Sequence, residues 1–425
     1  MLDVNLIRRN PEEVKKGIAK KNFSPKLVDD FLALDEEWRK LTKQIDDLRA
    51  EQKKLSDERK IEEATKIKDK IQSLESELRK LEQNRQEILW QIPNLPSDDT
   101  PVGKDELENK VLRKWGEPKQ FDFKPRDNVE LGESLGIIDI ENASRISGAR
   151  FNYVKGEAAL LEFALIQYVF DILTGAKLIK SFADKIEKGY SSKPFVPIVP
   201  PVMIRPDVLH KMALLKPEEE RYHIPKDDLY LIGSAEHTLG PLHMDEIIPE
   251  EKLPIRYVGF STSFRREAGS YGKDTRGILR VHQFDKLEME SFTVPEDSIK
   301  EQDFIIAIQE YLMQSLEIPY QVVAICTGDM GGPDVRQIDI EVWMPSQNRY
   351  RESHTSDYMA DYQARRLNTK VRRKNNELQF VHMNDATAFA IGRTLIAILE
   401  NYQQKDGSVL VPKVLQGYMG FKKIG

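Results

Sequence analysis

The feature that most constrains this chain is a heptad repeat within its first hundred residues. Apolar side chains recur there at alternating steps of three and four, in two runs separated by a short polar stretch at 57–63. The runs are Phe31, Leu34, Trp38, Leu41, Ile45, Leu48 and Leu55, and then Ala64, Ile67, Ile71, Leu74, Leu78, Leu81 and Ile88. This spacing places the apolar side chains on one seam of each helix. It predicts an antiparallel coiled-coil hairpin whose arms are ~45 Å long.

A hairpin this thin cannot enclose a pocket, so its role is to reach a partner or to hold two bodies apart. Its tip is only slightly basic. The preceding segment is more clearly basic, because it carries Arg8, Arg9, Lys15, Lys16, Lys20 and Lys21 against Asp3, Glu12 and Glu13. The residues alone leave open an ordinary coiled coil that serves dimerisation or spacing.

The length of 425 residues predicts more than one domain, and we place the boundary between 1–100 and 101–425. The single cysteine, Cys326, excludes an internal disulfide and favours a reducing compartment, which we take to be the cytoplasm. The first residues lack the apolar core of a secretory signal, and no stretch approaches the ~18 apolar residues that span a bilayer. We therefore expect no membrane partner. The net charge of -6 argues against nonspecific nucleic-acid binding by the whole surface, but not against a local basic patch.

Residues 101–425 mix helices and strands in an order that predicts an α+β domain, with an antiparallel sheet flanked by helices. We expect strands at 195–201, 257–263, 287–294, 321–326 and 338–343. Helices are expected at 156–175, 296–315 and 388–402.

The chain has no GxxxxGK[ST] phosphate loop and no GxGxxG motif. Its seven histidines are scattered without metal-ligand spacing, so we expect no zinc site. Four arginines and two lysines instead lie within the 22 residues 265–286, in a strand, a Gly-rich loop and a returning strand. Arginine forks grip phosphates bidentately, and Phe284 could stack on a flat base. A polyphosphate site and a charged surface hairpin both fit these residues.

The same segment, FRREAGSYGKDTRG followed by RVHQFDKLEM, resembles motif 2 of class II aminoacyl-tRNA synthetases in the form typical of seryl-tRNA synthetases. Further stretches resemble that family in the expected order: motif 1 at 195–201 with Pro201 at the interface proline, Ser-Ala-Glu at 234–236 (Thr-Ala-Glu in the family, so Ser234 keeps the hydroxyl), TGDMG at 327–331, DIEVWMP at 339–345 (DLEVWMP in the family), and motif 3 at 392–394 and 399–403. The N-terminal hairpin is similar to the family's tRNA-gripping arm. The resemblance covers essentially the whole chain.

The resemblance implies roles for individual residues. ATP would be bound by Arg265, Arg266, Glu267, Arg280, Phe284, Glu352, Ser353, His354, Thr355 and Arg393, with Mg²⁺ held through ATP and Glu352. L-serine would be bound by Ser234, Ala235, Glu236, Arg265, Glu288, Asp385 and Thr387. Arg265, Arg393 and Glu288 would be the catalytic residues.

Three departures from the family pattern concern the amino-acid pocket. Asp385 stands where the family usually has Asn, and Asn384 where it has an aliphatic residue. The stretch after Glu352, which is rich in small residues in the family, reads SHTSDY here. We expect Asp385 to pair with a nearby base and His354 to face solvent from a loop.

The resemblance implies a homodimeric ligase that activates L-serine with ATP and transfers it to the 3′ end of tRNA-Ser, and possibly of tRNA-Sec. Two other classes of function stay open. A synthetase-like paralogue that aminoacylates a carrier protein would be expected to shorten or lose the arm. A non-catalytic regulatory homologue would be expected to lose the phosphate-binding arginines.

Overall fold

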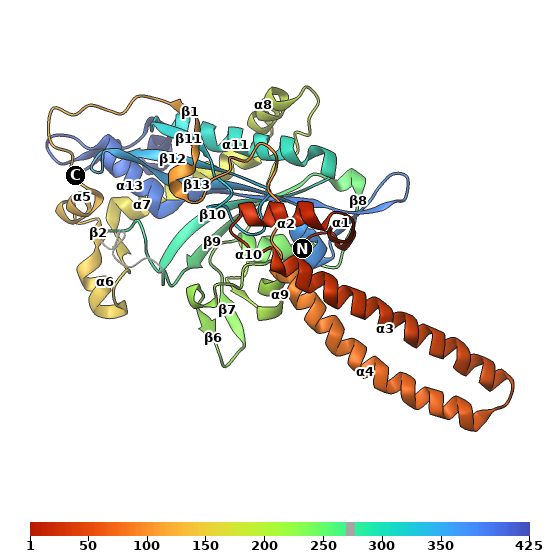
Figure 1. The fold of residues 1–425 in the computed structure, drawn as a ribbon. Helices are drawn as coiled ribbons and strands as arrows, with labels where there is room; N and C mark the ends of the chain where they lie inside the picture. The colour runs from red at the N-terminus through yellow and green to blue at the C-terminus, as the bar shows by residue number, and fades with distance from the viewer. Residues whose placement is uncertain (269–276) are drawn as a thin grey trace. The chain divides into compact units, whose positions relative to one another are not determined.

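The computed structural model describes residues 1–268 and 277–425, so the expected Gly-rich loop at 269–276 lies outside the described residues. The chain divides into two units, Met1–Pro96 and Ser97–Gly425, each with its own core (Figure 1).

The first unit consists of four helices, α1 (Val4–Arg9), α2 (Pro11–Lys20), α3 (Lys26–Asp57) and α4 (Ile61–Gln91). Helices α3 and α4 lie side by side as a long hairpin (Figure 1). The heptad side chains pack along its seam, where Leu41, Ile45, Ile71 and Leu81 are buried. The predicted coiled coil is therefore confirmed. Its turn is shorter than expected, because α4 begins only four residues after α3 ends.

A buried carboxylate links helices α1, α3 and α4 at the base of the hairpin. Asp35 on α3 has a fully buried side chain and accepts hydrogen bonds from Arg8 of α1 at 2.8 Å, Arg39 of α3 at 3.2 Å and Arg85 of α4 at 2.8 Å. The Arg85 guanidinium also lies 4.9 Å from the ring centre of Trp38. Arg85 occupies the seam position between Leu81 and Ile88 in the second heptad run, and this contact explains why a charged residue stands there.

The second unit is built on an eight-stranded sheet. The strand order is β1 (Lys110–Trp115), β11 (Tyr320–Ala324), β12 (Arg336–Met344), β13 (Arg349–Ala360), β16 (His382–Ala390), β10 (Gln283–Thr293), β9 (Ile255–Phe264) and β4 (Val196–Ile198). All neighbours are antiparallel except β4 and β9. The α+β prediction is confirmed.

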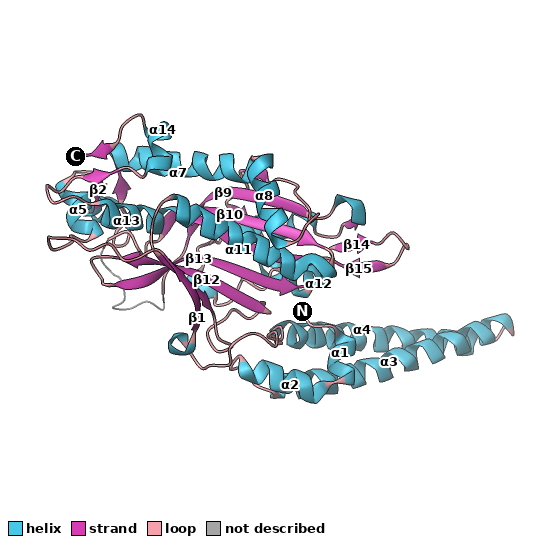
Figure 2. Cartoon of the chain, turned by 90° about the horizontal axis from the view of Figure 1, so that it is seen from above, coloured by secondary structure: helices cyan, strands magenta, loops and turns pink. Residues whose placement is uncertain are grey.

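The helices α7 (Gly156–Thr174), α11 (Ser298–Ser315) and α13 (Ile391–Tyr402) pack against one face of this sheet, and α8 (Ala176–Ile186) packs on α7 and α11 (Figure 2). Side chains alternate between the two faces of a strand. On β10, Leu287 and Met289 face the helical core, so Lys286, Glu288 and Glu290 face the opposite side. One face of the sheet is thus apolar and covered, whereas the other carries charged side chains.

Smaller elements complete the second unit. The short helices are α5 (Asn128–Ser134), α6 (Ile140–Ser147), α9 (Pro206–Lys211), α10 (Glu236–Leu239), α12 (Tyr362–Leu367) and α14 (Gln416–Met419). The short strands are β2 (Ile138–Asp139), β3 (Tyr153–Val154), β5 (Met203–Ile204), β6 (His223–Ile224), β7 (Leu229–Leu231), β8 (Ile247–Pro249), β14 (Lys370–Arg372), β15 (Leu378–Phe380), β17 (Val409–Leu410) and β18 (Lys423–Ile424).

Two central strands differ from the sequence-based expectation. β13 contains the stretch 353–358, which we expected to form a loop, and the start of the helix expected at 388–402 belongs to β16. Both strands carry polar side chains on the face turned away from the helices, so neither shows the apolar run by which a strand is recognised.

Within the described ranges, no single helix is long and apolar enough to cross a membrane. Helices α7 and α8 together would pass that test by length and composition, but they are bent by 63° at their junction.

The Asp35 cluster generates a prediction for the stability of the hairpin. Asp35→Asn removes the negative charge that three arginines share, and loss of one partner of a buried ion pair costs about 3 kcal/mol or more. Hydrogen–deuterium exchange of the full chain should show faster exchange over residues 4–91. The exposed Asp47→Asn in the same helix is the matched control, and equal exchange in both variants would contradict the assigned role.

Candidate active site

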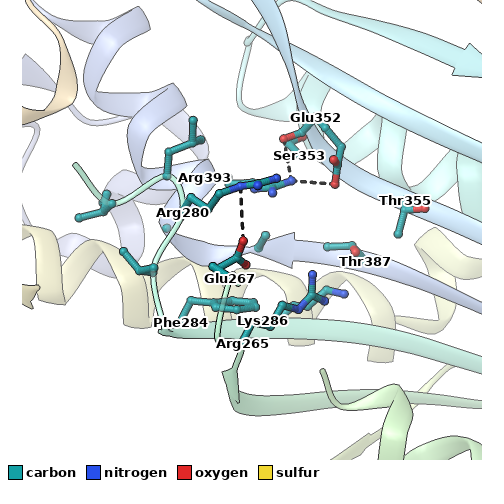
Figure 3. A pocket seen from close by; sticks show the side chains of 15 residues that line it. Arg265, Glu267, Arg280, Phe284, Lys286, Glu352, Ser353, Thr355, Thr387 and Arg393 are labelled. Atoms are coloured by element: carbon teal, nitrogen blue, oxygen red, sulfur yellow. Dashed lines mark hydrogen bonds and ion pairs between the residues drawn. The ribbon is translucent and has the colours of Figure 1, made fainter. Parts of the chain in front are cut away.

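The polar face of the central strands forms the floor of a pocket (Figure 3). It is lined by Arg265, Glu267, Ile278, Leu279, Arg280, Val281, Phe284, Lys286, Glu352, Ser353, Thr355, Thr387, Ala390, Gly392 and Arg393. Phe284 and Lys286 come from β10, Thr387 from β16 and Arg393 from α13. Arg265 directly follows β9. Because β9 and β10 are antiparallel, the end of β9 lies beside the start of β10, and Arg265 therefore lies near Phe284.

Three arginines converge on this pocket, and each is oriented by an oxygen of the protein. Arg393 donates to a carboxylate oxygen of Glu352 at 2.7 Å and to its backbone carbonyl at 3.1 Å. Arg280 lies 3.5 Å from the Glu267 carboxylate, and Arg265 donates to the carbonyl of Gly233 at 3.0 Å. Guanidinium groups held in fixed orientations can grip a polyphosphate with their remaining N–H groups.

The ion pair between Arg393 and Glu352 is mutually reinforcing. The positive charge of Arg393 lowers the pKa of Glu352, and Glu352 raises the pKa of Arg393, although desolvation opposes both shifts. Glu352 is therefore a carboxylate at neutral pH. Beside this pair, the ring of Phe284 faces the pocket, and the Arg265 guanidinium lies 5.4 Å from the centre of that ring. The pocket combines cations with a flat apolar surface.

A smaller polar cluster lies next to this pocket, and we call it the inner cluster: Ser234, Glu236, Lys286 and Glu288. Lys286 Nζ donates to Ser234 Oγ at 3.1 Å and lies 2.5 Å from Glu288 Oε2 and 3.9 Å from Glu236 Oε2. Ser234 Oγ lies 3.0 Å from the Glu236 carboxylate and 3.2 Å from that of Glu288. The four side chains are buried or nearly so.

The two glutamates of the inner cluster differ in their ionisation. Burial raises the pKa of Glu288 to about 7, although Lys286 opposes this shift. Burial would also raise the pKa of Glu236, but Lys286, Arg265 and the hydrogen bond from Ser234 together outweigh it, and the pKa is lowered. Two carboxyl groups whose pKa values are moved apart can bind different polar groups of one small ligand.

Asp385 and Thr387 lie on β16 beside the inner cluster, and both are almost fully buried. Thr387 stands opposite Glu288, and Asp385 stands between Glu290 of β10 and Asp357 of β13. The expected pairing of Asp385 with a base is wrong: among the described residues no Lys, Arg or His forms an ion pair with it, and carboxylates surround it instead.

A β-bulge brings two neighbouring groups to the same side of β13. Thr355 stands opposite Asp339 and Glu352 stands opposite Glu341, so Ser353 is the extra residue in the ladder. In a regular strand, residues three apart would face opposite sides of the sheet. The bulge lets Glu352 and Thr355 line the same pocket.

The structure gathers most of the residues singled out from the sequence, and the exceptions are informative. Arg266 does not line the pocket, because its guanidinium lies over the ring of Tyr222 at 5.6 Å. His354 does not face solvent from a loop: it is 1% exposed in β13 and packs against Phe389, with ring centres 5.7 Å apart. Ala235 is fully buried before α10 and contributes no polar side chain.

Three acidic or basic side chains at the site were missing from the sequence-based set. Lys286 and Glu290 share the polar face of β10 with Glu288, and Asp357 lies opposite Asp385. Because alternate residues of a strand face the same side, Lys286 and Glu290 could have been identified from their positions two residues before and after Glu288. Asp357 could not be found, because β13 was not recognised as a strand.

Comparisons with known proteins agree with this architecture. Residues 219–402 match the tRNA synthetase class II core domain (G, H, P, S and T), and residues 1–96 match the seryl-tRNA synthetase N-terminal domain. The chain is 40% identical to the serine--tRNA ligase of Pseudothermotoga lettingae over 100% of both chains, and 41% identical to that of Dictyoglomus turgidum over 100% of this chain and 99% of the relative.

Two solved structures are also similar over the whole chain. The seryl-tRNA synthetase from Pyrococcus horikoshii, complexed with ATP, has a TM-score of 0.90 and 40% identity, with 100% of this chain and 99% of that chain covered. The cytoplasmic serine-tRNA ligase from Naegleria fowleri, in complex with AMP, has a TM-score of 0.87 and 33% identity, with 100% and 98% covered.

The sheet, its arginine-lined face and the matched core domain define an aminoacyl-tRNA synthetase of class II, which is a ligase. More narrowly, the chain belongs to the seryl-tRNA synthetase family. The resemblance drawn from the sequence motifs is thereby confirmed.

A second cavity, which also includes Phe284 in its lining, generates a prediction about pH. It contains Glu162 of α7 and Asp285 of β10. Burial and the adjacent Asp285 raise the pKa of Glu162 to about 8. The folded chain therefore holds a proton that the unfolded chain has released above about pH 4.5, so this pair costs increasing stability as the pH rises toward 8.

Glu162→Gln removes this titration. The melting temperature of the variant, measured from pH 5 to 8.5, should exceed that of the unchanged protein by a margin that grows with pH. Glu133 is exposed, so the melting temperature of Glu133→Gln should change with pH in the same way as that of the unchanged protein. A constant difference between Glu162→Gln and the unchanged protein would contradict the raised pKa.

Proposed function

We propose that this chain condenses L-serine with ATP to seryl-adenylate and transfers the seryl group to the 3′ end of tRNA-Ser. This is the activity named by its curated relatives. The observation that carries the proposal is the arginine-lined pocket beside the inner cluster on one face of the sheet. In the first step, a serine carboxylate oxygen attacks the α-phosphorus of ATP and pyrophosphate leaves. In the second step, a hydroxyl of the tRNA 3′ end attacks the seryl carbonyl and AMP leaves.

The pocket residues suit the first step. Arg265 would contact the α-phosphate and stabilise the charge that develops there, while Arg280 and Arg393 would hold the outer phosphates. Phe284 would stack on the adenine, and Glu267 would face its amino group. The similar structures carry ATP and AMP, which supports this assignment. Ser353 and Thr355 line the same pocket with hydroxyl groups.

The Glu352 carboxylate is suited to a magnesium ion bound together with ATP. Mg²⁺ prefers oxygen ligands and is usually held by one or two carboxylates plus substrate phosphates. Glu352 lines the pocket on the same side as Arg393, and it stays ionised at neutral pH. When bound, the ion would supply positive charge and orient the phosphates.

The inner cluster suits the amino acid. Glu236, which is ionised, would receive the ammonium group, whereas Glu288 and Thr387 would bind the hydroxyl of serine. Alanine lacks that hydroxyl and would leave these buried polar groups unpaired, which is how such a site rejects it. Ser234 is already hydrogen-bonded to both glutamates and would fix their positions.

The hairpin of the first unit suits tRNA. It presents charged side chains along its whole length, so it can follow the shape and the phosphates of an RNA helix. A paralogue that acylates a carrier protein would have no use for such an arm. A non-catalytic homologue would not be expected to retain Arg265, Arg280 and Arg393 in one pocket.

The second unit also bears a surface suited to a second copy of the chain. Leu160 and Phe163 of α7 are 53% and 67% exposed, and Val196 and Val199 in and after β4 are 53% and 79% exposed. α7 and β4 pack against each other, so these apolar side chains lie on neighbouring elements. Exposed apolar side chains gathered on neighbouring elements are typical of an interface, which supports a closed two-fold dimer. The single cysteine fits a place for this dimer in the reducing cytoplasm.

The ATP assignment is tested at Arg265. Arg265→Ala should lower serine-dependent ATP–pyrophosphate exchange by at least about 10²-fold, as expected for loss of a group that stabilises developing charge. Arg266→Ala is the matched control, because Arg266 is adjacent in sequence but turned toward Tyr222. Exchange retained in Arg265→Ala, or lost equally in both variants, would remove the assignment.

The role of the arm is tested by shortening it. Residues 50–74 can be replaced by a short Gly-rich turn between Arg49 and Glu75, which already form an ion pair at 2.8 Å. This deletion keeps the Asp35 cluster. Adenylate formation should stay within about 2-fold, while kcat/KM for tRNA charging should fall by at least about 10²-fold, equivalent to loss of about 3 kcal/mol of tRNA binding. Equal loss of both activities would mean that the arm does not bind tRNA.

A further inference from the structure

We propose that His237 is a positioning residue for serine activation: it holds the loop 233–235 so that the ATP pocket and the inner cluster keep fixed positions relative to each other. The inference rests on the proposed function, since the two parts of the site that this loop connects are those assigned to ATP and to serine. In that assignment His237 acts through the loop and contacts neither substrate.

The loop 233–235 contacts both parts of the site. The carbonyl of Gly233 accepts a hydrogen bond from Nε of Arg265 at 3.0 Å, and Arg265 lines the ATP pocket. Oγ of the next residue, Ser234, lies 3.2 Å from the Glu288 carboxylate within the inner cluster. A shift of this loop would therefore move Arg265 and the inner cluster relative to each other.

His237 closes this loop with two hydrogen bonds. It lies in α10, whose first residue is Glu236, and its backbone N–H donates to the carbonyl of Ser234 at 3.2 Å. Its ring Nδ1 accepts a hydrogen bond from the backbone N–H of Gly233, also at 3.2 Å. This second bond reaches the residue whose carbonyl binds Arg265. The side chain of His237 thus fixes Gly233, and through Gly233 it orients Arg265.

The His237 ring has the protonation state that this role requires. Nδ1 can accept a hydrogen bond only while it carries no proton. Burial lowers the pKa of His237 to about 3, with Arg221 and Arg265 adding to this shift and Glu236 opposing it. The ring is therefore neutral at neutral pH, and its proton is on Nε2. Nε2 lies 3.7 Å from Oε1 of Glu236, so the ring lies against both the loop and the inner cluster.

The surroundings of Gly233 leave it little room to move. A Cβ atom on Gly233 would lie 2.8 Å from Nη1 of Arg221 and 3.2 Å from Cε1 of His237. Both distances are shorter than the ~3.5–4.0 Å of an ordinary carbon contact, so these side chains pack directly on the glycine backbone. Removal of the ring would free one side of the loop. A misplacement of ~1 Å can cost ~10²-fold in rate, even when the change lies away from the reacting atoms.

Three substitutions at His237 separate this role from simple packing. His237→Asn keeps an acceptor, because Oδ1 of asparagine takes the place of Nδ1 of histidine. His237→Leu keeps a buried side chain and removes the acceptor. His237→Gln ends at the level of Nε2, so it keeps a polar group near Glu236 and lacks an acceptor at the level of Nδ1. The glutamine variant replaces the leucine variant if the latter does not fold.

The measurement is pre-steady-state formation of seryl-adenylate by the full-length protein, with saturating ATP and L-serine, followed by ATP–pyrophosphate exchange. The amplitude of the first turnover counts the correctly folded sites, and its rate constant reports the alignment of the two substrates.

We expect His237→Leu and His237→Gln to keep this amplitude and to lower the rate constant by at least about 30-fold. In exchange, KM for each substrate should change less than about 3-fold, because the lost interaction acts on alignment rather than on binding. His237→Asn should recover the rate constant to within about 5-fold of the unchanged protein, because it restores the hydrogen bond to Gly233.

Two results would overturn the positioning role. A lower amplitude with an unchanged rate constant in His237→Leu and His237→Gln would mean that the ring only stabilises the fold. A rate constant in His237→Asn as low as in His237→Leu would mean that the hydrogen bond to Gly233 does not position the site. In both cases the unchanged protein still forms seryl-adenylate, so the proposed function stands. Failure of the unchanged protein to form seryl-adenylate would instead overturn the proposed function, and this inference with it.

Discussion

The structure of the second unit depends on a sheet with two chemically opposite faces. Leu287 and Met289 on β10 are buried against helices, while Lys286, Glu288 and Glu290 on the same strand face the pocket. The apolar face supplies the hydrophobic free energy that offsets the cost of burying so many charges on the other face. Because the helical layer fixes the position of each strand, it also fixes the spacing of the polar groups that the strands carry.

The first unit depends on a different interaction, although the principle is similar. Its heptad seam buries a modest apolar surface, and the helices near its base are joined by Asp35 with its three arginines. Burial alone would raise the pKa of Asp35, but the hydrogen bonds from Arg8 and Arg85 lower it. The stabilisation is therefore present at neutral pH and is lost only as the pH falls below about 4.

The sequence predicted the hairpin, the α+β class and five strands of the main sheet, because each has a clear period of apolar residues. β13 and β16 were missed, because the polar side chains that face the pocket interrupt the apolar pattern of these strands. His354 illustrates the consequence. We expected it to be exposed because we assigned it to a loop, whereas in the structure it lies in a strand and its side chain faces the core. The motifs identified which residues gather at the pocket, but the row of Glu290, Asp385 and Asp357 became visible only from the strand register.

The bulge at Ser353 makes the chain sensitive to length at that point. Glu352 and Thr355 reach one pocket only because a single extra residue separates two regular stretches of β13. Exchanging the side chain of Ser353 would leave this count unchanged, whereas an insertion or deletion of one residue would turn one of the two groups into the helical core. Substitutions should therefore accumulate in this strand during evolution far more readily than changes in its length.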